Sequence, residues 1–261
     1  MAVALPETQA EPTLRLRGVG RRFGGLHAVR DVDIDVFPGE RRGILGPNGA
    51  GKTTLFNVIS GDLPPSAGTL ELLGHDVTHM PARKRAKLGL ARTYQQSHML
   101  LGLTVEDSIY LAILGVGEGH VRPVVFPRRD GEIRERARGA ARRAAIDHKL
   151  NEPVGSLSHG EHRQVAVAMA LASEPKVLML DEPASGLSRG ERQLLTDLLL
   201  ELDRDITLLL IEHDMDVALR VAERVTVMHE GRVIVEGTPD EIRANELVHD
   251  LYLGRHHYAG E

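Results

Sequence analysis

The sequence predicts an α/β fold in which a core built around a phosphate-binding loop carries an N-terminal antiparallel β subdomain and an inserted helical subdomain. Three observations support this prediction. The glycine-rich stretch GPNGAGKTT at 46–54 lies between a short apolar run, RRGIL, and a helix-like segment, TLFNVIS. A second apolar run, VLML, ends at the acids Asp181 and Glu182. Upstream, LRLRGVGRRF and VDIDVF alternate apolar and polar residues with the period of half-buried strands.

Composition is that of an ordinary soluble globular protein, with 42% apolar and 26% charged residues in a chain of 261. The net charge of −5 gives no general reason to expect binding to nucleic acid. The lack of cysteine excludes disulfides and thiolate metal sites. The longest apolar run, Val165–Ala172, is far shorter than the ~20 residues that cross a bilayer, and the N-terminus does not resemble a signal peptide. Any membrane role must therefore come through a partner chain.

The antiparallel strands after the frayed tail at 1–12 contain one prominent aromatic residue, Phe23. The chain has only four Phe, four Tyr and no Trp, and Phe23 lies between Arg22 and Gly24 shortly before the glycine-rich loop. It is placed to stack on an adenine ring; the alternative is a strand aromatic packed in the core.

The glycine-rich loop contains G-x-x-x-x-G-K-T in register at Gly46, Gly51, Lys52 and Thr53. Glycines let successive N–H groups point inward at a helix N-terminus, where the dipole also favours an anion. Lys52 then reaches the β- and γ-phosphates, and the Thr53 hydroxyl is placed to ligate Mg²⁺. The alternative is a turn that only caps a helix. The predicted nucleotide-binding set is Gly46, Pro47, Asn48, Gly49, Ala50, Gly51, Lys52, Thr53 and Thr54.

Beyond the loop helix, the chain predicts a strand and turn at 68–77, a basic amphipathic helix at 81–91 and a strand at 90–95. Gln95 follows this last strand. Its side-chain carbonyl can bridge Mg²⁺ or the attacking water, although a lone glutamine there is more often a solvated loop residue.

A change of character at 97–157 indicates the helical subdomain. One helix begins near Thr104, and an Arg- and Ala-rich helix covers 132–146. Eight arginines lie between Arg122 and Arg143. They suit a phosphate-backbone or lipid-headgroup patch, but a solvated helix face is favoured over it.

The segment LSHGE starts a helix rich in Val and Ala. Ser158, three residues before Glu161, predicts a capping box, and with Gly160 it also makes an anion site at the exposed helix start. The two interpretations are compatible, because the same helix end can meet a phosphate.

The acids after VLML emerge where open α/β sheets place their ligands. Asp181 fits the carboxylate that binds the outer shell of Mg²⁺, and Glu182 fits the residue that orients or deprotonates the hydrolytic water. His213 follows the next strand at the equivalent position, where it can contact the γ-phosphate; a lone His is otherwise structural. The rest of the chain is predicted to form a capped helix at 188–202, a helix at 215–225, a hairpin at 225–237 and one final capped helix at 238–254.

Taken together, these motifs resemble the ATP-binding cassette (ABC) ATPase family over essentially the whole chain. The loop at 46–54 is similar to its Walker A motif, Gln95 to the Q-loop, LSHGE to the signature, VLMLDE to Walker B, His213 to the switch histidine and Phe23 to the A-loop aromatic. The resemblance implies a RecA-like core divided as 1–96, 97–164 and 165–261, with the helical subdomain in the middle. It also implies ATP and Mg²⁺ as cofactors, with Lys52, Gln95, Glu182 and His213 catalytic, Thr53, Gln95 and Asp181 at the metal, and Ser158 and Gly160 facing ATP across a dimer.

A narrower resemblance rests on three segments, FGGLHAV, IEHDMDVAL and LYLG. They resemble the ATP-binding subunits of branched-chain or hydrophobic amino-acid importers, and lipopolysaccharide-export ATPases are the nearest relatives of that group. This implies a second cassette, either a copy of the chain or a sister subunit, integral membrane permease subunits, an extracytoplasmic substrate-binding protein and a place on the cytoplasmic face of the cell membrane. Nucleic acid is not an expected partner.

Three residues depart from the commonest family motifs. His159 and Glu161 replace Gly and Gln in the signature, and Ser188 replaces the usual aspartate of the following loop. Two other classes of function stay open: a soluble ABC protein acting on DNA or ribosomes, and a nucleotide sensor that does not hydrolyse ATP.

Overall fold

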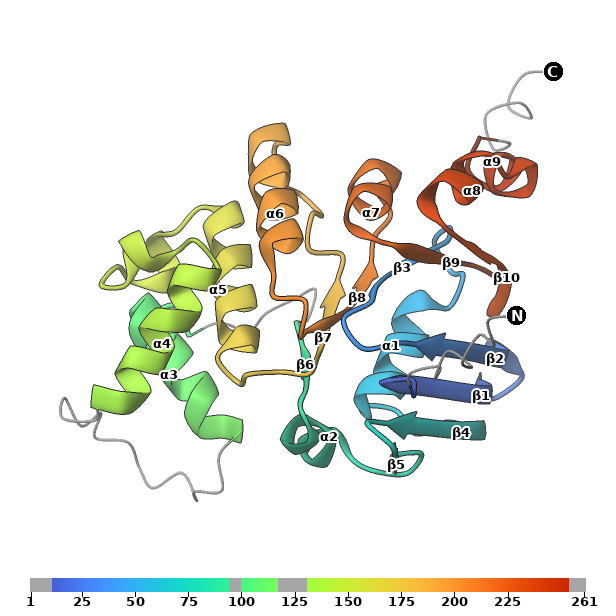
Figure 1. Cartoon of the computed structure of the whole chain (residues 1–261), viewed down its shortest axis with the longest axis horizontal. Coiled ribbons are helices and arrows are strands. Elements are labelled where there is room, and N and C mark those ends of the chain that lie inside the picture. Colours follow the sequence, from blue (N-terminus) through green and yellow to red (C-terminus); the bar gives the residue numbers. More distant parts are fainter. Residues whose placement is uncertain (1–10, 94–99, 117–130, 254–261) are drawn as a thin grey trace, which may run out of the picture.

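The computed structural model describes residues 11–93, 100–116 and 131–253. Within these residues the chain forms a four-stranded antiparallel sheet, in the order β2-β1-β4-β5, and a six-stranded sheet, in the order β10-β9-β3-β8-β7-β6. The two sheets lie on opposite sides of helix α1, and helix α2 lies on the same side of the six-stranded sheet as α1 (Figure 1). The other helices cover the outer face of the six-stranded sheet or extend beyond its β6 edge. The fold is therefore the predicted α/β core with an antiparallel β layer.

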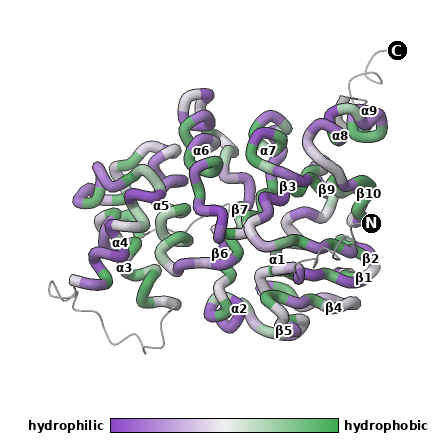
Figure 2. The backbone as a smooth tube through the Cα atoms, in the orientation of Figure 1, coloured by the Kyte–Doolittle hydropathy of each residue, from purple (hydrophilic) through white to green (hydrophobic). Residues whose placement is uncertain are grey.

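The antiparallel sheet follows from the alternation of buried apolar and more exposed charged residues at 14–17 and 32–36. The inward residues Leu14, Leu16 and Ile34 are buried, whereas their neighbours on the other face are charged, and Figure 2 shows this alternation along β1 and β2. The strands are β1 (Leu14–Phe23), β2 (Leu26–Val36), β4 (Ala67–Leu72) and β5 (His75–Asp76).

The six-stranded sheet is parallel except for β10, which pairs antiparallel with β9. Its central strands β3, β8 and β7 are short and buried along their whole length, because helices or the second sheet cover both faces. The carboxyl ends of β3, β8, β7 and β6 lie side by side, which is the edge where such sheets bind ligands. The strands are β3 (Arg41–Leu45), β6 (Leu90–Arg92), β7 (Val177–Asp181), β8 (Thr207–Ile211), β9 (Arg224–His229) and β10 (Arg232–Gly237).

Helix α1 (Lys52–Ser60) starts at the glycine-rich loop and packs between the sheets. Leu55, Phe56 and Ile59 share one apolar cluster with β1, β2 and the inner residues of β7 and β8. The opposite face of β7 and β8 packs against α5 (His159–Leu171), α6 (Arg189–Glu201) and α7 (Met215–Val221). The loop is thus fixed to the most deeply buried part of the molecule.

Helices α3 (Val105–Val116) and α4 (Gly131–Arg143) pack against α5 beyond the β6 edge of the sheet (Figure 1). Thr104 precedes α3, and its hydroxyl accepts a hydrogen bond from the Asp107 amide at 3.1 Å, which is an N-cap. Two short 3₁₀ turns, η1 (Asp147–Lys149) and η2 (Val154–Ser156), lead from α4 to α5.

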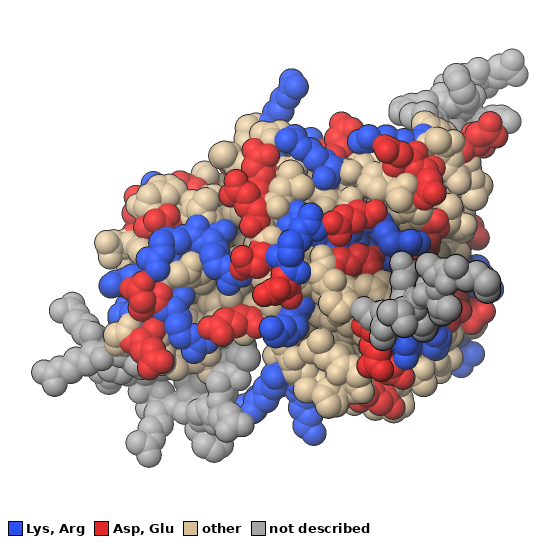
Figure 3. Space-filling view, in the orientation of Figure 1, with Lys and Arg blue, Asp and Glu red and all other residues tan. Residues whose placement is uncertain are grey.

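The arginines of α4 are held in ion pairs within the chain. Arg134 and Arg138 each contact Glu106 at 2.8 Å, and Arg143 contacts Asp203 at 2.8 Å. Figure 3 shows the basic and acidic side chains interleaved over this part of the visible face. The described arginines therefore form a neutralised helix face; Arg122 and the other two arginines before 131 lie outside the described residues.

The C-terminal segment differs from the single predicted helix. It forms α8 (Pro239–Arg243) and α9 (Glu246–Leu253), because Asn245 ends the first turn and accepts a hydrogen bond from the Val248 amide at 3.3 Å. The basic helix after β5 is α2 (Ala82–Leu88). No helix among the described residues has the length and apolar character needed to cross a membrane.

Candidate nucleotide-binding site

The glycine-rich loop joins β3 to α1, and its glycines have backbone angles that other residues rarely adopt. Gly46, Gly49 and Gly51 have φ of 152°, 83° and 97°. A Cβ on Gly51 would lie 2.2 Å from the carbonyl oxygen of Ala28, and one on Gly46 2.3 Å from that of Met228. The loop therefore needs glycine both for its curvature and for its close approach to β2 and β9.

A turn far along the chain holds the loop in place. The Gly231 amide donates to the Ala50 carbonyl at 3.0 Å, and the Arg30 amide donates to the Gly231 carbonyl at 2.7 Å. No side chain caps the start of α1, so its first N–H groups are available to an anion.

Lys52 is 5% exposed, and its ammonium group donates to the carbonyls of Gly46 at 2.6 Å and Pro47 at 3.1 Å. Burial lowers the pKa of Lys52, while the carboxylates of Glu182 and Asp181 act in the opposite direction. The loop thus folds back around its own cation, close to both acids.

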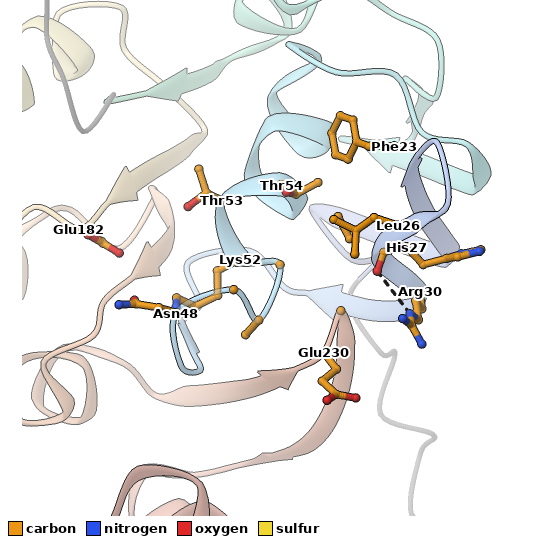
Figure 4. A pocket seen from close by; sticks show the side chains of 15 residues that line it. Phe23, Leu26, His27, Arg30, Asn48, Lys52, Thr53, Thr54, Glu182 and Glu230 are labelled. Atoms are coloured by element: carbon orange, nitrogen blue, oxygen red, sulfur yellow. Dashed lines mark hydrogen bonds between the residues drawn. The ribbon is translucent and has the colours of Figure 1, made fainter. Parts of the chain in front are cut away.

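A cavity of about 620 Å³ opens over the loop. Figure 4 shows the loop residues Asn48, Lys52 and Thr53 in the middle of the view, with Glu182 to one side of them and Phe23 and His27 to the other. Phe23 is 43% exposed, and its ring lies beneath the Arg21 guanidinium at 4.7 Å, so it is a cavity residue and not a core aromatic. The lining consists of Phe23, Leu26, His27, Ala28, Arg30, Asn48, Gly49, Ala50, Gly51, Lys52, Thr53, Thr54, Glu182, Glu230 and Gly231.

Asp181 ends β7 with its side chain 2% exposed. Its Oδ2 accepts a hydrogen bond from Arg92 at 2.8 Å, whereas its buried Oδ1 has no hydrogen-bond partner among the described residues. These residues contain no cluster of three or more His, Asp or Glu that holds a metal alone. Mg²⁺ commonly binds through one or two carboxylates together with phosphate and water. The orphaned Oδ1 and the Thr53 hydroxyl fit such an ion, delivered with a nucleotide.

Glu182 directly follows β7 in the left-handed region, with φ of 48°, and its amide donates to Ile211 at 2.9 Å. The His213 imidazole Nδ1 lies 4.0 Å from Glu182 Oε2 and 4.0 Å from Glu212 Oε2. The parallel pairing of β7 with β8 therefore brings the predicted acid and histidine together. Gln95 lies outside the described residues.

Ser158 and Gly160 lie apart from this cavity and do not line it. Ser158 caps α5 in the predicted capping box: its hydroxyl accepts from the Glu161 amide at 3.2 Å, and its own amide donates to the Glu161 carboxylate at 2.7 Å. The Gly160 amide donates to Glu191 at 3.1 Å. The two predicted phosphate-facing groups of the signature are therefore separated, within one chain, from the loop that they are expected to complement.

The sequence interpretation missed Arg92 and Glu212. Arg92 was seen only as part of a strand, although a cation at the end of a strand next to Asp181 is a usable signal once strand order is known. Glu212 is fully buried beside His213, with Oε1 accepting from the Ala184 amide at 2.7 Å, and burial raises its pKa. Leu26, His27, Arg30 and Glu230 were also missed, because only the tertiary fold brings them to the cavity.

The site combines a glycine-rich loop and a buried lysine with two acids and a histidine at the same sheet edge. This combination defines a P-loop nucleotide-binding protein. A family model described as ABC transporter matches residues 29–185, and one described as branched-chain amino acid ATP-binding cassette transporter matches residues 232–258. The chain belongs to the ABC transporter ATP-binding family, whose cassettes bind nucleotide and hydrolyse ATP to power transport.

Individual relatives agree with this assignment along nearly the whole chain. The high-affinity branched-chain amino acid transport ATP-binding protein LivG of Escherichia coli (strain K12) is 34% identical over 252 residues, covering 94% of this chain and 99% of LivG. The corresponding BraF of Pseudomonas aeruginosa is 33% identical over 252 residues, covering 94% and 99%. The solved structure of MJ1267, an ATP-binding cassette of an ABC transporter, matches with a TM-score of 0.85 at 29% identity, covering 94% of this chain and all of MJ1267.

Proposed function

We propose that this chain hydrolyses ATP to drive uptake of branched-chain or other hydrophobic amino acids through separate membrane permease subunits. The observation that carries the substrate class is the match of residues 232–258 to the branched-chain amino acid cassette model, together with near full-length similarity to LivG and BraF. A lipopolysaccharide-export type of cassette is the alternative, and no residue of the described cavity favours it.

In this proposal the backbone amides at the start of α1 and the Lys52 ammonium bind the phosphates, and Phe23 stacks on the adenine ring. Thr53 and Asp181 hold Mg²⁺, which neutralises phosphate charge when bound. Glu182 orients and deprotonates the attacking water, and His213 contacts the γ-phosphate. Gln95 is assigned to the metal and the water by its position in the sequence alone.

The assembly that we propose contains a second cassette, because Ser158 and Gly160 lie away from the cavity of their own chain. Each nucleotide then lies between the loop of one cassette and the signature of the other. The division into 1–96, 97–164 and 165–261 is part of the same proposal. So are the permeases, the extracytoplasmic substrate-binding protein and a location on the cytoplasmic face of the cell membrane. The ion-paired arginines of α4 argue against the nucleic-acid alternative.

The test replaces Glu182 by Gln. The purified variant is expected to bind ATP as the wild type does and to hydrolyse it roughly 10²-fold or more slowly, because the water loses its base. Cells that depend on the variant are expected to lose uptake of radiolabelled leucine. Glu174→Gln is the matched control, since Glu174 is also an acid with positive φ, at 52°, but is not among the residues that line the cavity. Unchanged hydrolysis would remove Glu182 from its role, whereas lost hydrolysis with normal leucine uptake would overturn the substrate class.

A further inference from the structure

Arg92 connects the metal-facing acid to the far end of the loop helix. Its side chain is 5% exposed at the end of β6, the strand next to β7. One guanidinium nitrogen, Nη2, donates to Asp181 Oδ2 at 2.8 Å. The other, Nη1, donates to Asn57 Oδ1 at 2.7 Å, Ser60 Oγ at 2.9 Å and Asp62 Oδ2 at 3.1 Å. Asn57 and Ser60 belong to α1, which begins at Lys52.

The contact with Asp181 is one-sided. Arg92 binds Oδ2 and leaves the buried Oδ1 without a hydrogen-bond partner among the described residues. Burying a carboxylate without compensation is costly, so Arg92 offsets the burial of Asp181 while fixing which oxygen is available.

The geometry points to Arg92 as a positioning residue: we propose that it sets the orientation of Asp181 toward Mg²⁺ and fixes the distance between this acid and the phosphate-binding helix. The inference rests on the proposed role of Asp181 at the metal. Arginine suits the task because its planar fork reaches two sites at fixed directions, whereas the single ammonium of lysine cannot span both. The Arg92 guanidinium also lies 5.7 Å from the centroid of the Phe56 ring, which helps to hold it in place.

A purely structural ion pair would affect stability alone, so the test measures metal binding directly. Wild type, Arg92→Met, Arg92→Lys and Asp181→Asn are each loaded with a non-hydrolysable ATP analogue, and Mn²⁺ binding is followed by electron paramagnetic resonance. Binding of the analogue in EDTA is measured separately. Loss of a partner that orients a metal ligand typically weakens metal affinity 10–100-fold. Arg92→Met is expected to show this loss with unchanged binding of the analogue in EDTA, and Arg92→Lys a smaller loss.

Asn57→Ala is the second variant, because it removes an anchor of Arg92 on α1 without touching Asp181. It is expected to weaken Mn²⁺ binding in the same direction, which keeps the proposal testable if Arg92→Met does not fold. Arg134→Met, which breaks an ion pair in the helical part of the molecule, is the control and leaves Mn²⁺ binding unchanged. If Asp181→Asn weakens Mn²⁺ binding and the Arg92 and Asn57 variants do not, the positioning role of Arg92 is overturned, while the proposed role of Asp181 at the metal stands. If Asp181→Asn does not change Mn²⁺ binding, both the proposed metal site and the positioning role of Arg92 are overturned.

Discussion

Glu212 is a carboxyl group with no exposed surface, between the end of β8 and His213. Burial raises its pKa above the ordinary value of 4.5, and the hydrogen bond from the Ala184 amide offsets only part of this rise. The folded protein therefore keeps this proton to a higher pH than the unfolded chain does. Between the two pKa values the folded state binds more protons, so the free energy of unfolding falls as the pH rises from 4.5 through the folded pKa.

Glu212→Gln removes this dependence, because the amide is neutral at every pH and nearly the same size. The free energy of unfolding of the variant, relative to wild type, is expected to increase as the pH rises above 4.5. Urea denaturation at a series of pH values measures it, with the exposed Glu174→Gln as control. A difference between variant and wild type that does not change with pH would show that Glu212 titrates alike in the folded and unfolded chain.

At the residue scale, the sequence was informative where chemistry is encoded in local spacing. Lys52 could be selected from the sequence because the glycine-rich loop around it has its own pattern, and Asp181 and Glu182 because they directly follow a short apolar strand. The structure brings the loop and the two acids to one sheet edge. Arg92 and Glu212 could not, because their partners lie far away in the sequence: Arg92 contacts Asp181 on the neighbouring strand, and Glu212 accepts from Ala184 in the turn after β7. Asp181 is 89 residues from Arg92, and nothing in local sequence specifies which strands become neighbours.

Ser188, which departs from the common family motif, has a structural role at the scale of one helix. It is the N-cap of α6 in a capping box with Glu191, to which its hydroxyl and amide donate at 2.7 Å and 2.9 Å. Glu191 also accepts the amide of Gly160, so this cap joins the start of α6 to the start of α5.

Ser188→Ala is expected to lower the free energy of unfolding by about 1 kcal/mol, the usual cost of losing such a cap. Ser188→Thr keeps a hydroxyl at the same position and is expected to retain most of the stability. Urea denaturation of both variants gives the comparison. Equal loss in the two variants would mean that the hydroxyl is not the stabilising group.

Helix starts were predictable because capping residues carry their own signal. The capping box predicted at Ser158 forms, and the helices predicted to be capped at Ser188 and Thr238 begin with such boxes too. The end of the chain was predicted less well: apolar periodicity continues past Asn245, but the chain breaks there, and the Asn245 side chain accepts a hydrogen bond from the Val248 amide at the start of α9.

At the scale of the whole molecule, the proposed nucleotide site needs two groups, Lys52 and Ser158, that do not lie together within one chain. The cavity holds Lys52, and Ser158 lies exposed at the start of α5. If two copies exchange these halves, variants damaged in different halves complement each other, because symmetric pairing puts the intact loop of one chain against the intact signature of the other.

Lys52→Ala and Ser158→Arg chains are each expected to lack hydrolysis, and an equimolar mixture is expected to regain up to about a quarter of wild-type activity, since about half of the dimers are mixed and each has one intact site. Phosphate release by the mixture, compared with each variant alone at the same total concentration, is the measurement. A mixture as inactive as its components would argue against a homodimer and for a sister subunit.

The turn between β9 and β10 touches the phosphate loop through Gly231, whose amide and carbonyl bind Ala50 and Arg30. The segment matched by the branched-chain cassette model starts at the very next residue, 232. Replacing that segment by the one from a relative therefore changes the residue next to Gly231, and a chimaera in which Gly231 moves loses hydrogen bonds that hold the phosphate loop as well as its own C-terminal segment.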